Sequence, residues 1–294
     1  MYYDALKTFV TVADKQNFTK AAKKLRISQP SVSLHVKNLE EEFQTALFVR
    51  NPKKLTITPT GDMLYDRAKQ ILAMYEQTRQ DILEHHHAVK GAIQVGASFT
   101  IGEYIVPSLF MKIRENFPDL GLDLEIGNTA EIVQSVRRLN VDIGLIEGQS
   151  NDPGLLIQPF MEDELFVVAP SDHPLARKHE ADITDLHHET WIAREEGSGT
   201  RKYLDHVIRS NGLQVKSMIT ISSNQGVKES VIHGLGLSLL SKSVVERNMK
   251  HNDLAMIPIK GHSFKRRFSY VCSPIMAKKR NVETFMEIVN EWGI

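Results

Sequence analysis

The sequence predicts a protein in two parts, a short helical segment at the N-terminus and a longer segment of α/β type. Apolar residues near the N-terminus recur at the three- and four-residue spacing of amphipathic helices. Beyond Gly91, strand-like runs alternate with helical ones. The length of 294 residues also fits about two domains of ordinary size. The expected parts are residues 1–58, a connecting helix over 59–90, and residues 91–294.

Composition excludes several classes of protein. The chain is 41% hydrophobic and 24% charged, as in ordinary soluble globular proteins. It has no apolar run near the roughly 20 residues needed to span a bilayer, and its N-terminus lacks the pattern of a secretory signal. The single cysteine, Cys272, has no partner for a disulfide or a zinc site, and we expect it to be a small buried side chain in a strand. We therefore expect a cytoplasmic protein without membrane contact.

Charge is unevenly distributed, although the formal net charge of the whole chain is zero. Residues 1–58 contain ten Lys/Arg and five Asp/Glu, a net charge of +5, which leaves −5 for the rest. A basic segment in a neutral chain favours contact with a polyanion such as nucleic acid. The N-terminal part is therefore the candidate for nucleic-acid binding.

Three helices are expected within this basic part. The first is indicated by four apolar residues at helical spacing, Leu6, Phe9, Val10 and Ala13. The second begins near Phe18, with Thr19 as its expected cap. A three-residue turn, 26–28, precedes the third helix, in which Ser28 can serve as the cap and Pro30 falls in the first turn.

The third helix, expected to run to Glu41, has two distinct faces. Its apolar inner face consists of Val32, Val36 and Leu39. A separate polar face consists of Gln29, Ser33 and Lys37. A polar helix face is usually only solvated, but two short helices joined by a three-residue turn in a basic segment fit a helix-turn-helix whose second helix enters the major groove. The polar face is therefore expected to contact DNA.

Two strand-like runs, 47–50 and 54–58, flank Asn51 and Pro52 and predict a hairpin, the wing of a winged helix-turn-helix. Three basic residues lie near its tip, Arg50, Lys53 and Lys54. Phosphate contacts from such residues add affinity without selecting a sequence.

The run 18–33, followed by 39–40, 47–50 and 55–61, resembles the DNA-binding domain of LysR-type transcriptional regulators. The resemblance extends over essentially the whole chain, and it implies a sequence-specific DNA-binding transcriptional regulator. By this resemblance Gln29, Pro30 and Ser33 approach base edges. The family often has Arg where this chain has Leu34, so contact with a thymine methyl would replace a contact to guanine. The expected DNA-binding residues are Thr19, Gln29, Pro30, Ser31, Ser33, Leu34, Lys37, Arg50, Lys53 and Lys54.

A long helix is expected from Thr58 and Pro59, a cap followed by proline, to about His87. Its heptad-like seam consists of Leu64, Ala68, Ile71, Tyr75, Thr78 and Ile82. Such a helix either pairs with a second copy or packs on its own domain; in the resembling family it dimerises, and two dimers commonly form a tetramer. The three histidines 85–87 point in successive directions on a helix and are not expected to bind a metal ion.

Residues 91–294 contain two successive sets of strand-like and helical runs, which predict two α/β lobes built on parallel sheets. The expected lobes are I, residues 91–161 and 266–294, and II, residues 162–265. Ligands in open α/β sheets collect beyond the carboxyl ends of strands, so two lobes imply a cleft with polar residues at strand ends. This architecture resembles the effector domain of the same family, which is like a periplasmic binding protein.

Four polar segments follow predicted strands in this part. The most informative is 197–201, Gly-Ser-Gly-Thr-Arg, which opens a helix and offers amides and hydroxyls to an anion. The same residues also fit a flexible turn with a cap, and the spacing is not that of a P-loop. Family members with a similar stretch include regulators of carbon fixation and of sulfur or cysteine metabolism. The expected effector-binding residues are Ser98, Phe99, Thr100, Glu147, Ser198, Gly199, Thr200, Arg201, Ser222 and Asn224.

These patterns predict a regulator controlled by a small anionic metabolite, or by a zwitterion because Glu147, Glu195 and Glu196 would favour an amine. An enzyme is not expected, since the sequence shows no nucleophile elbow, metal-ligand cluster or dinucleotide fingerprint, and no cofactor is expected. A solute-binding protein would leave the basic helix-turn-helix unexplained. A DNA-binding regulator without a ligand stays open. Expected partners are double-stranded DNA, the effector and further copies of this chain, with RNA polymerase as an additional candidate.

Overall fold

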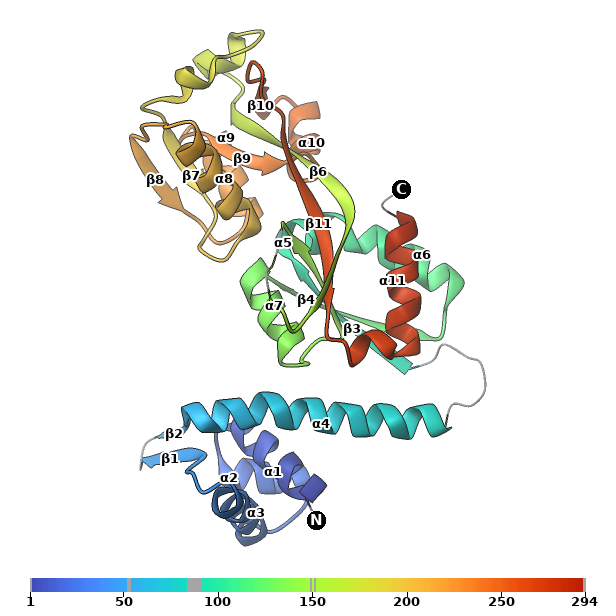
Figure 1. The fold of residues 1–294 in the computed structure, drawn as a ribbon. Helices are drawn as coiled ribbons and strands as arrows, with labels where there is room; N and C mark the ends of the chain where they lie inside the picture. The colour runs from blue at the N-terminus through green and yellow to red at the C-terminus, as the bar shows by residue number, and fades with distance from the viewer. Residues whose placement is uncertain (1, 52–53, 84–90, 149, 151, 293–294) are drawn as a thin grey trace. The chain divides into compact units, whose positions relative to one another are not determined.

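The computed structural model describes residues 2–51, 54–83, 91–148, 150 and 152–292. The chain divides into two compact units, Met1–Ala88 and Val89–Ile294 (Figure 1). The first unit contains the three expected helices, the expected hairpin and the long helix. In chain order these are α1 (Tyr2–Lys15), α2 (Phe18–Leu25), α3 (Gln29–Glu42), β1 (Phe48–Asn51), β2 (Lys54–Ile57) and α4 (Pro59–Leu83).

Helix caps of the first unit agree with expectation at two positions and differ at one. Ser28 Oγ accepts the N–H of Ser31 at the start of α3, and Thr58 Oγ1 accepts the N–H of Gly61 at 2.9 Å at the start of α4. The expected cap Thr19 is wrong. Asn17, whose backbone is extended, caps α2 by accepting the N–H of Lys20 at 2.9 Å, so Thr19 already lies inside the first turn.

Helix α4 also differs from the prediction, because part of its apolar side packs into the core of the first unit. The inner face of α3 is buried as expected, and Ala68 of α4 is buried in the same cluster, with Leu64 packed against it. Ala68 is therefore occupied within its own unit, whereas Leu64 keeps part of its surface exposed. The ring of Tyr75 packs against that of Tyr3, with centroids 4.5 Å apart and the planes tilted by 42°. The predicted heptad seam therefore cannot include Ala68, because an apolar period does not tell which partner buries it.

The second unit is built on a mixed sheet, whereas the sequence suggested parallel sheets. Strand β3 runs parallel to β4 and β5, but β11 is antiparallel to both β5 and β6, and β6 is antiparallel to β9 and β10. Alternating patterns identify strands without fixing their direction. The strands are β3 (Gly91–Ser98), β4 (Leu120–Gly127), β5 (Ile143–Glu147), β6 (Leu156–Pro170), β9 (Ser238–Ser241), β10 (Leu254–Ile257) and β11 (Phe264–Cys272).

Two long strands link the two lobes. Figure 1 shows β6, which is 15 residues long, and β11 running together from one lobe into the other. The expected lobe boundaries at 161/162 and 265/266 fall inside these strands. The second lobe also has a small parallel sheet of β7 (Thr190–Ala193) and β8 (Ser217–Thr220).

Helices cover both lobes. Those beside β3, β4 and β5 are α5 (Phe99–Tyr104), α6 (Val106–Asn116), α7 (Thr129–Arg137) and α11 (Arg280–Trp292). Those of the second lobe are α8 (Gly199–Ser210), α9 (Asn224–Ile232) and α10 (Lys242–Lys250). Short 3₁₀ helices span Pro174–Arg177, Ile183–Leu186 and Met276–Lys278.

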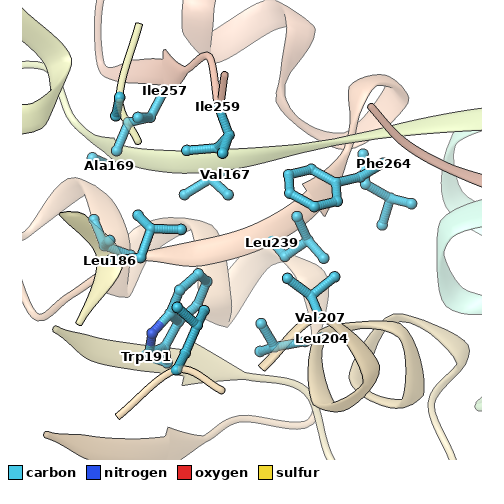
Figure 2. Close-up of a cluster of buried hydrophobic side chains, with 14 of the residues drawn as sticks. Val167, Ala169, Leu186, Trp191, Leu204, Val207, Leu239, Ile257, Ile259 and Phe264 are labelled. Atoms are coloured by element: carbon cyan, nitrogen blue, oxygen red, sulfur yellow. The ribbon is translucent and has the colours of Figure 1, made fainter. Parts of the chain in front are cut away.

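The second lobe has its own apolar core, which packs the middle of α8 against the sheet. Trp191 of β7 is fully buried and lies among residues of α8, β6 and β9 (Figure 2), including Leu204, Val167 and Leu239. Cys272 is buried in β11 as expected, and burial raises the pKa of its thiol to about 12. The thiol is therefore protonated and packs as a small apolar group.

Candidate functional site

The exposed face of α3 carries the side chains expected to read DNA. Gln29 and Pro30 are exposed, and Gln29 Nε2 donates to Ser33 Oγ at 3.0 Å. Lys37 is exposed and pairs with Glu41 at 3.3 Å. This face therefore combines an amide, hydroxyls and a cation on successive turns of one helix.

Leu34 and the hairpin complete this surface. Leu34 is an apolar side chain on α3 with 55% of its surface exposed, which suits contact with a thymine methyl better than solvent. Glu40 Oε1 accepts the N–H of Leu47 at 2.8 Å and so ties α3 to the start of the hairpin. Thr19 is exposed on α2 and Ser31 is partly exposed. The side chains of Arg50 and Lys54 and the whole of Lys53 lie outside the described residues.

The second unit contains an open cleft of about 640 Å³ between α7 and α8. That volume is in the range of small-molecule sites. One wall is the start of α7 with Thr129, Ala130 and Val133, and the other is α8 with the turn before it. Its charged lining residues are Glu147, Glu196, Arg201, Lys202, Asp205 and Arg209.

The turn before α8 is shaped by two glycines. Gly197 has φ +90°, a left-handed conformation that favours glycine. A Cβ on Gly199 would lie 2.6 Å from Glu147 Cβ and 2.7 Å from Glu147 O, so only glycine lets the start of α8 approach the end of β5. Ser198 Oγ accepts the N–H of Arg201 as the cap of α8. The predicted glycine-rich segment is thus a close junction at the cleft wall.

Glu147 is the centre of a buried polar cluster at the cleft floor. Its Oε1 accepts the backbone N–H of Thr100 at 3.1 Å, and its Oε2 accepts the hydroxyl of Thr200 at 2.9 Å and Arg266 Nη1 at 2.7 Å. Arg266 Nε also donates to Asp163 Oδ2 at 2.7 Å, and Ser241 Oγ donates to Asp163 Oδ1 at 2.6 Å. The side chains of both ion pairs are 2–3% exposed.

The ionisation of the two carboxyls follows from this geometry. Burial alone would raise the pKa of Glu147, but the guanidinium of Arg266 and hydrogen bonds from Thr100 and Thr200 hold it below its usual value. Burial raises the pKa of Asp163 in spite of the same guanidinium. Glu147 is therefore the carboxylate that is ionised more firmly.

A second buried cluster surrounds Arg194. Its guanidinium lies 4.5 Å from the ring centroid of Phe99, donates to Glu195 through two bonds, and donates to Asn224 Oδ1 at 2.6 Å. Asn224 Nδ2 in turn donates to Glu103 at 3.2 Å. This cluster joins α5 of one lobe to α9 of the other.

The structure separates the expected effector-binding residues into groups. Thr100 and Thr200 are buried and bond to Glu147, which lines the cleft together with Ser198, Gly199 and Arg201. Arg201 is directed to Asp205 at 2.9 Å and to the carbonyl of Arg194. Phe99 and Asn224 belong to the Arg194 cluster, and Ser98 is buried. Ser222 is exposed and is not among the residues that line the cleft.

Sequence reasoning missed three charged residues that organise the site, namely Arg266, Asp163 and Arg194. Each lies in or next to a strand, but Asp163 and Arg266 are flanked by charged residues on both sides and Arg194 on one side, so no pattern in the sequence marks them as buried. Metal sites and membrane-spanning helices were also sought in the described parts of the chain. There, no group of three or more His, Cys, Asp or Glu side chains could hold a metal ion, and no helix is long and apolar enough to cross a membrane. The histidines 85–87 lie outside those parts.

Both units match models of known protein families. Residues 3–62 match the model of the bacterial regulatory helix-turn-helix proteins of the lysR family, and residues 86–293 match the LysR substrate binding domain. The chain belongs to the LysR family. The predicted family and fold class, a helix-turn-helix unit followed by a two-lobed α/β unit, are thereby confirmed.

Individual relatives give the same result. The HTH-type transcriptional regulator CysL of Bacillus subtilis (strain 168) is 57% identical over 289 residues, covering 98% of this chain and 97% of that protein. The regulatory domain of CcmR from Synechocystis PCC6803, solved with 2-PG, is 25% identical with a TM-score of 0.65, over 69% of this chain and 98% of that one. Full-length OxyR from Pseudomonas aeruginosa has a TM-score of 0.82 at 24% identity, over 98% and 94% of the two chains.

This chain is therefore a LysR-type transcriptional regulator with a DNA-binding helix-turn-helix and an effector-binding domain, and it is not an enzyme. The match of the helix-turn-helix also excludes a solute-binding protein of a transporter.

Proposed function

We propose that a small anionic or zwitterionic metabolite binds in the cleft between α7 and α8 and controls how this regulator binds DNA. The observation that carries the proposal is the cleft wall at Ser198–Arg201, where a helix start with a capping hydroxyl faces about 640 Å³ of open volume. Amides at a helix start and a nearby exposed Lys202 favour an anionic group. Glu196, also exposed at the cleft, leaves room for an amine on the same ligand.

Residues at the cleft have different proposed roles. We assign direct ligand contacts to Ser198, Gly199 and Lys202, which line the open volume. Thr100 and Thr200 are buried and donate to Glu147, so they hold its carboxylate in position without lining the cleft. Ligand binding would bias the arrangement of the two lobes, and this bias would alter binding to DNA. CcmR, whose regulatory domain was solved with 2-PG, supports a small anion as the class of ligand.

Replacing Ser198 with Ala should lower the affinity for the effector about tenfold, the value of one hydrogen bond to a charged group. The matched control is Ser223→Ala, because Ser223 caps α9 in the same way and is not a cleft residue. Effectors would be sought by thermal shift with pooled metabolites and then measured by calorimetry and promoter footprinting. Equal loss in both variants would place the ligand elsewhere, and no metabolite response at all would favour a regulator without a ligand.

We also propose that α4 pairs with α4 of a second copy, that two such dimers form a tetramer, and that DNA sites are inverted half-repeats. The support is an exposed stripe on α4 formed by Ile71, Met74 and Thr78; the side chain of Ile82 lies outside the described residues. RNA polymerase is a further proposed partner at promoters, and the cytoplasm is the proposed location because the target is DNA.

Replacing Ile71 with Asp should lower the oligomeric mass measured by light scattering at micromolar concentration, because it places a charge in an apolar contact. Leu235→Asp is the matched control, since Leu235 and Ile71 are both 52% exposed and Leu235 lies in a loop of the other unit. An unchanged mass for Ile71→Asp would show that the α4 stripe is not the contact.

A further inference from the structure

The carboxylate of Glu147 is surrounded by a set of donors that matches an oxyanion. A backbone N–H (Thr100), a hydroxyl (Thr200) and a guanidinium (Arg266) converge on it from α5, α8 and β11 at 2.7–3.1 Å. Charge-assisted donors of these kinds replace the water around a buried anion. None of the three donors comes from a neighbour of Glu147 in the sequence, so the fold assembles them at one point.

Donor capacity at this point exceeds what Glu147 uses. Arg266 Nη2 is buried and has no hydrogen-bond partner among the described residues. Nη2 belongs to the same guanidinium whose Nη1 binds Glu147, so it lies beside that carboxylate. A buried donor without a partner is costly, so this guanidinium keeps the capacity to bind a further oxygen beside Glu147.

The charge balance explains why a second anion is excluded while Glu147 is in place. Arg266 faces two carboxylates, Glu147 and Asp163, so one positive charge is matched against two negative groups. Another oxyanion at the same point would meet repulsion in a buried site, where charges are poorly screened. Glu147 also lines the effector cleft.

We infer that Glu147 is the resident occupant of an oxyanion site at the cleft floor and that it determines effector specificity by keeping oxyanion groups out of that site. The inference rests on the proposed function in taking this cleft as the effector site. It implies that the effector presents a neutral or cationic group to the floor and its anionic group to the start of α8. It also implies that a chain without this carboxylate accepts a free oxyanion in its place.

The test is rescue of Glu147→Ala by formate, in the full-length protein. Formate supplies the carboxylate that the variant lacks, so formate at about ten times its Kd should raise the unfolding midpoint of the second unit by about 3 °C relative to chloride at equal ionic strength. Both tryptophans, Trp191 and Trp292, lie in this unit, so their fluorescence reports its unfolding. Wild-type protein should not respond to formate.

Glu196→Ala is the matched control, because it removes an exposed carboxylate from the same cleft. A folded Glu147→Ala that responds to formate no more than this control would overturn the inference. If Glu147→Ala fails to fold in both salts, Glu147→Gln decides. That variant keeps the side-chain volume, so its amide still fills the site, but it loses the charge that repels an anion in the adjacent cleft. It should therefore bind sulfate in the cleft about tenfold more tightly than wild type; equal affinity would overturn the inference.

The two proposals fail in different ways. Rescue by formate without any metabolite that alters the DNA footprint would support the oxyanion site and contradict the proposed function. If a metabolite binds at Ser198 but the Glu147 variants respond to neither formate nor sulfate, the proposed function would be supported and the oxyanion site contradicted.

Discussion

Replacing Arg266 with Met should lower the free energy of unfolding of the second unit by about 3–5 kcal/mol, the usual cost of removing one partner from a buried ion pair. Methionine fills a similar volume but leaves Glu147 and Asp163 buried without their cation. Equilibrium denaturation followed by tryptophan fluorescence measures this change, because Trp191 and Trp292 both lie in the second unit.

The control for this variant is the next residue of the same strand. Arg267 is exposed, so Arg267→Met should change stability by less than about 1 kcal/mol. A neutral triple variant with Glu147→Gln, Asp163→Asn and Arg266→Met should regain part of the stability, since the buried charges are removed together. An Arg266→Met protein as stable as Arg267→Met would mean that the ion pairs contribute nothing to the fold.

The N-terminal unit could be predicted from the sequence because its signals are local. Apolar spacing indicated the helices, and Ser28 and Thr58 indicated two helix starts. The error at Thr19 was also local, since Asn17 is an equally good cap only two residues earlier. Which residues pack against α4 depends on tertiary structure, which a helical period does not encode. This is why Ala68 was assigned to a contact between helices although it is buried in the core of its own unit.

The site in the second unit could be predicted only in part, for the same reason. The glycines and hydroxyls of 197–201 are adjacent in the sequence, and their helix-start geometry follows from that run. The partners of Glu147 do not follow from it, because Thr200 and Arg266 are 53 and 119 residues away. Arg266 reaches Glu147 through the antiparallel register of β11 with β5 and β6. Because the sequence was interpreted as forming parallel sheets, this contact could not be predicted.

The second large effect is expected on the affinity for specific DNA sites, because only a few residues supply the polar groups on the exposed face of α3. Gln29 and Ser33 are already joined by a 3.0 Å hydrogen bond, which fixes the direction of the glutamine amide before DNA binds. A preorganised amide loses less entropy on binding than a free one. The inner face of the helix is buried on Val32 and Val36, so changes on the outer face should leave the fold intact.

Replacing both Gln29 and Ser33 with Ala should weaken specific binding by about 1–3 kcal/mol for each good hydrogen bond to a base that the variant cannot make, roughly 2–6 kcal/mol for the pair. Binding to random duplexes should be largely unchanged, because phosphate contacts supply that affinity. The measurement is fluorescence anisotropy at one fixed salt concentration, with a site selected from random duplexes by the wild-type protein. An equal decrease on selected and random DNA would show that these side chains contact the backbone, and the polar face of α3 would then position the protein without reading the bases.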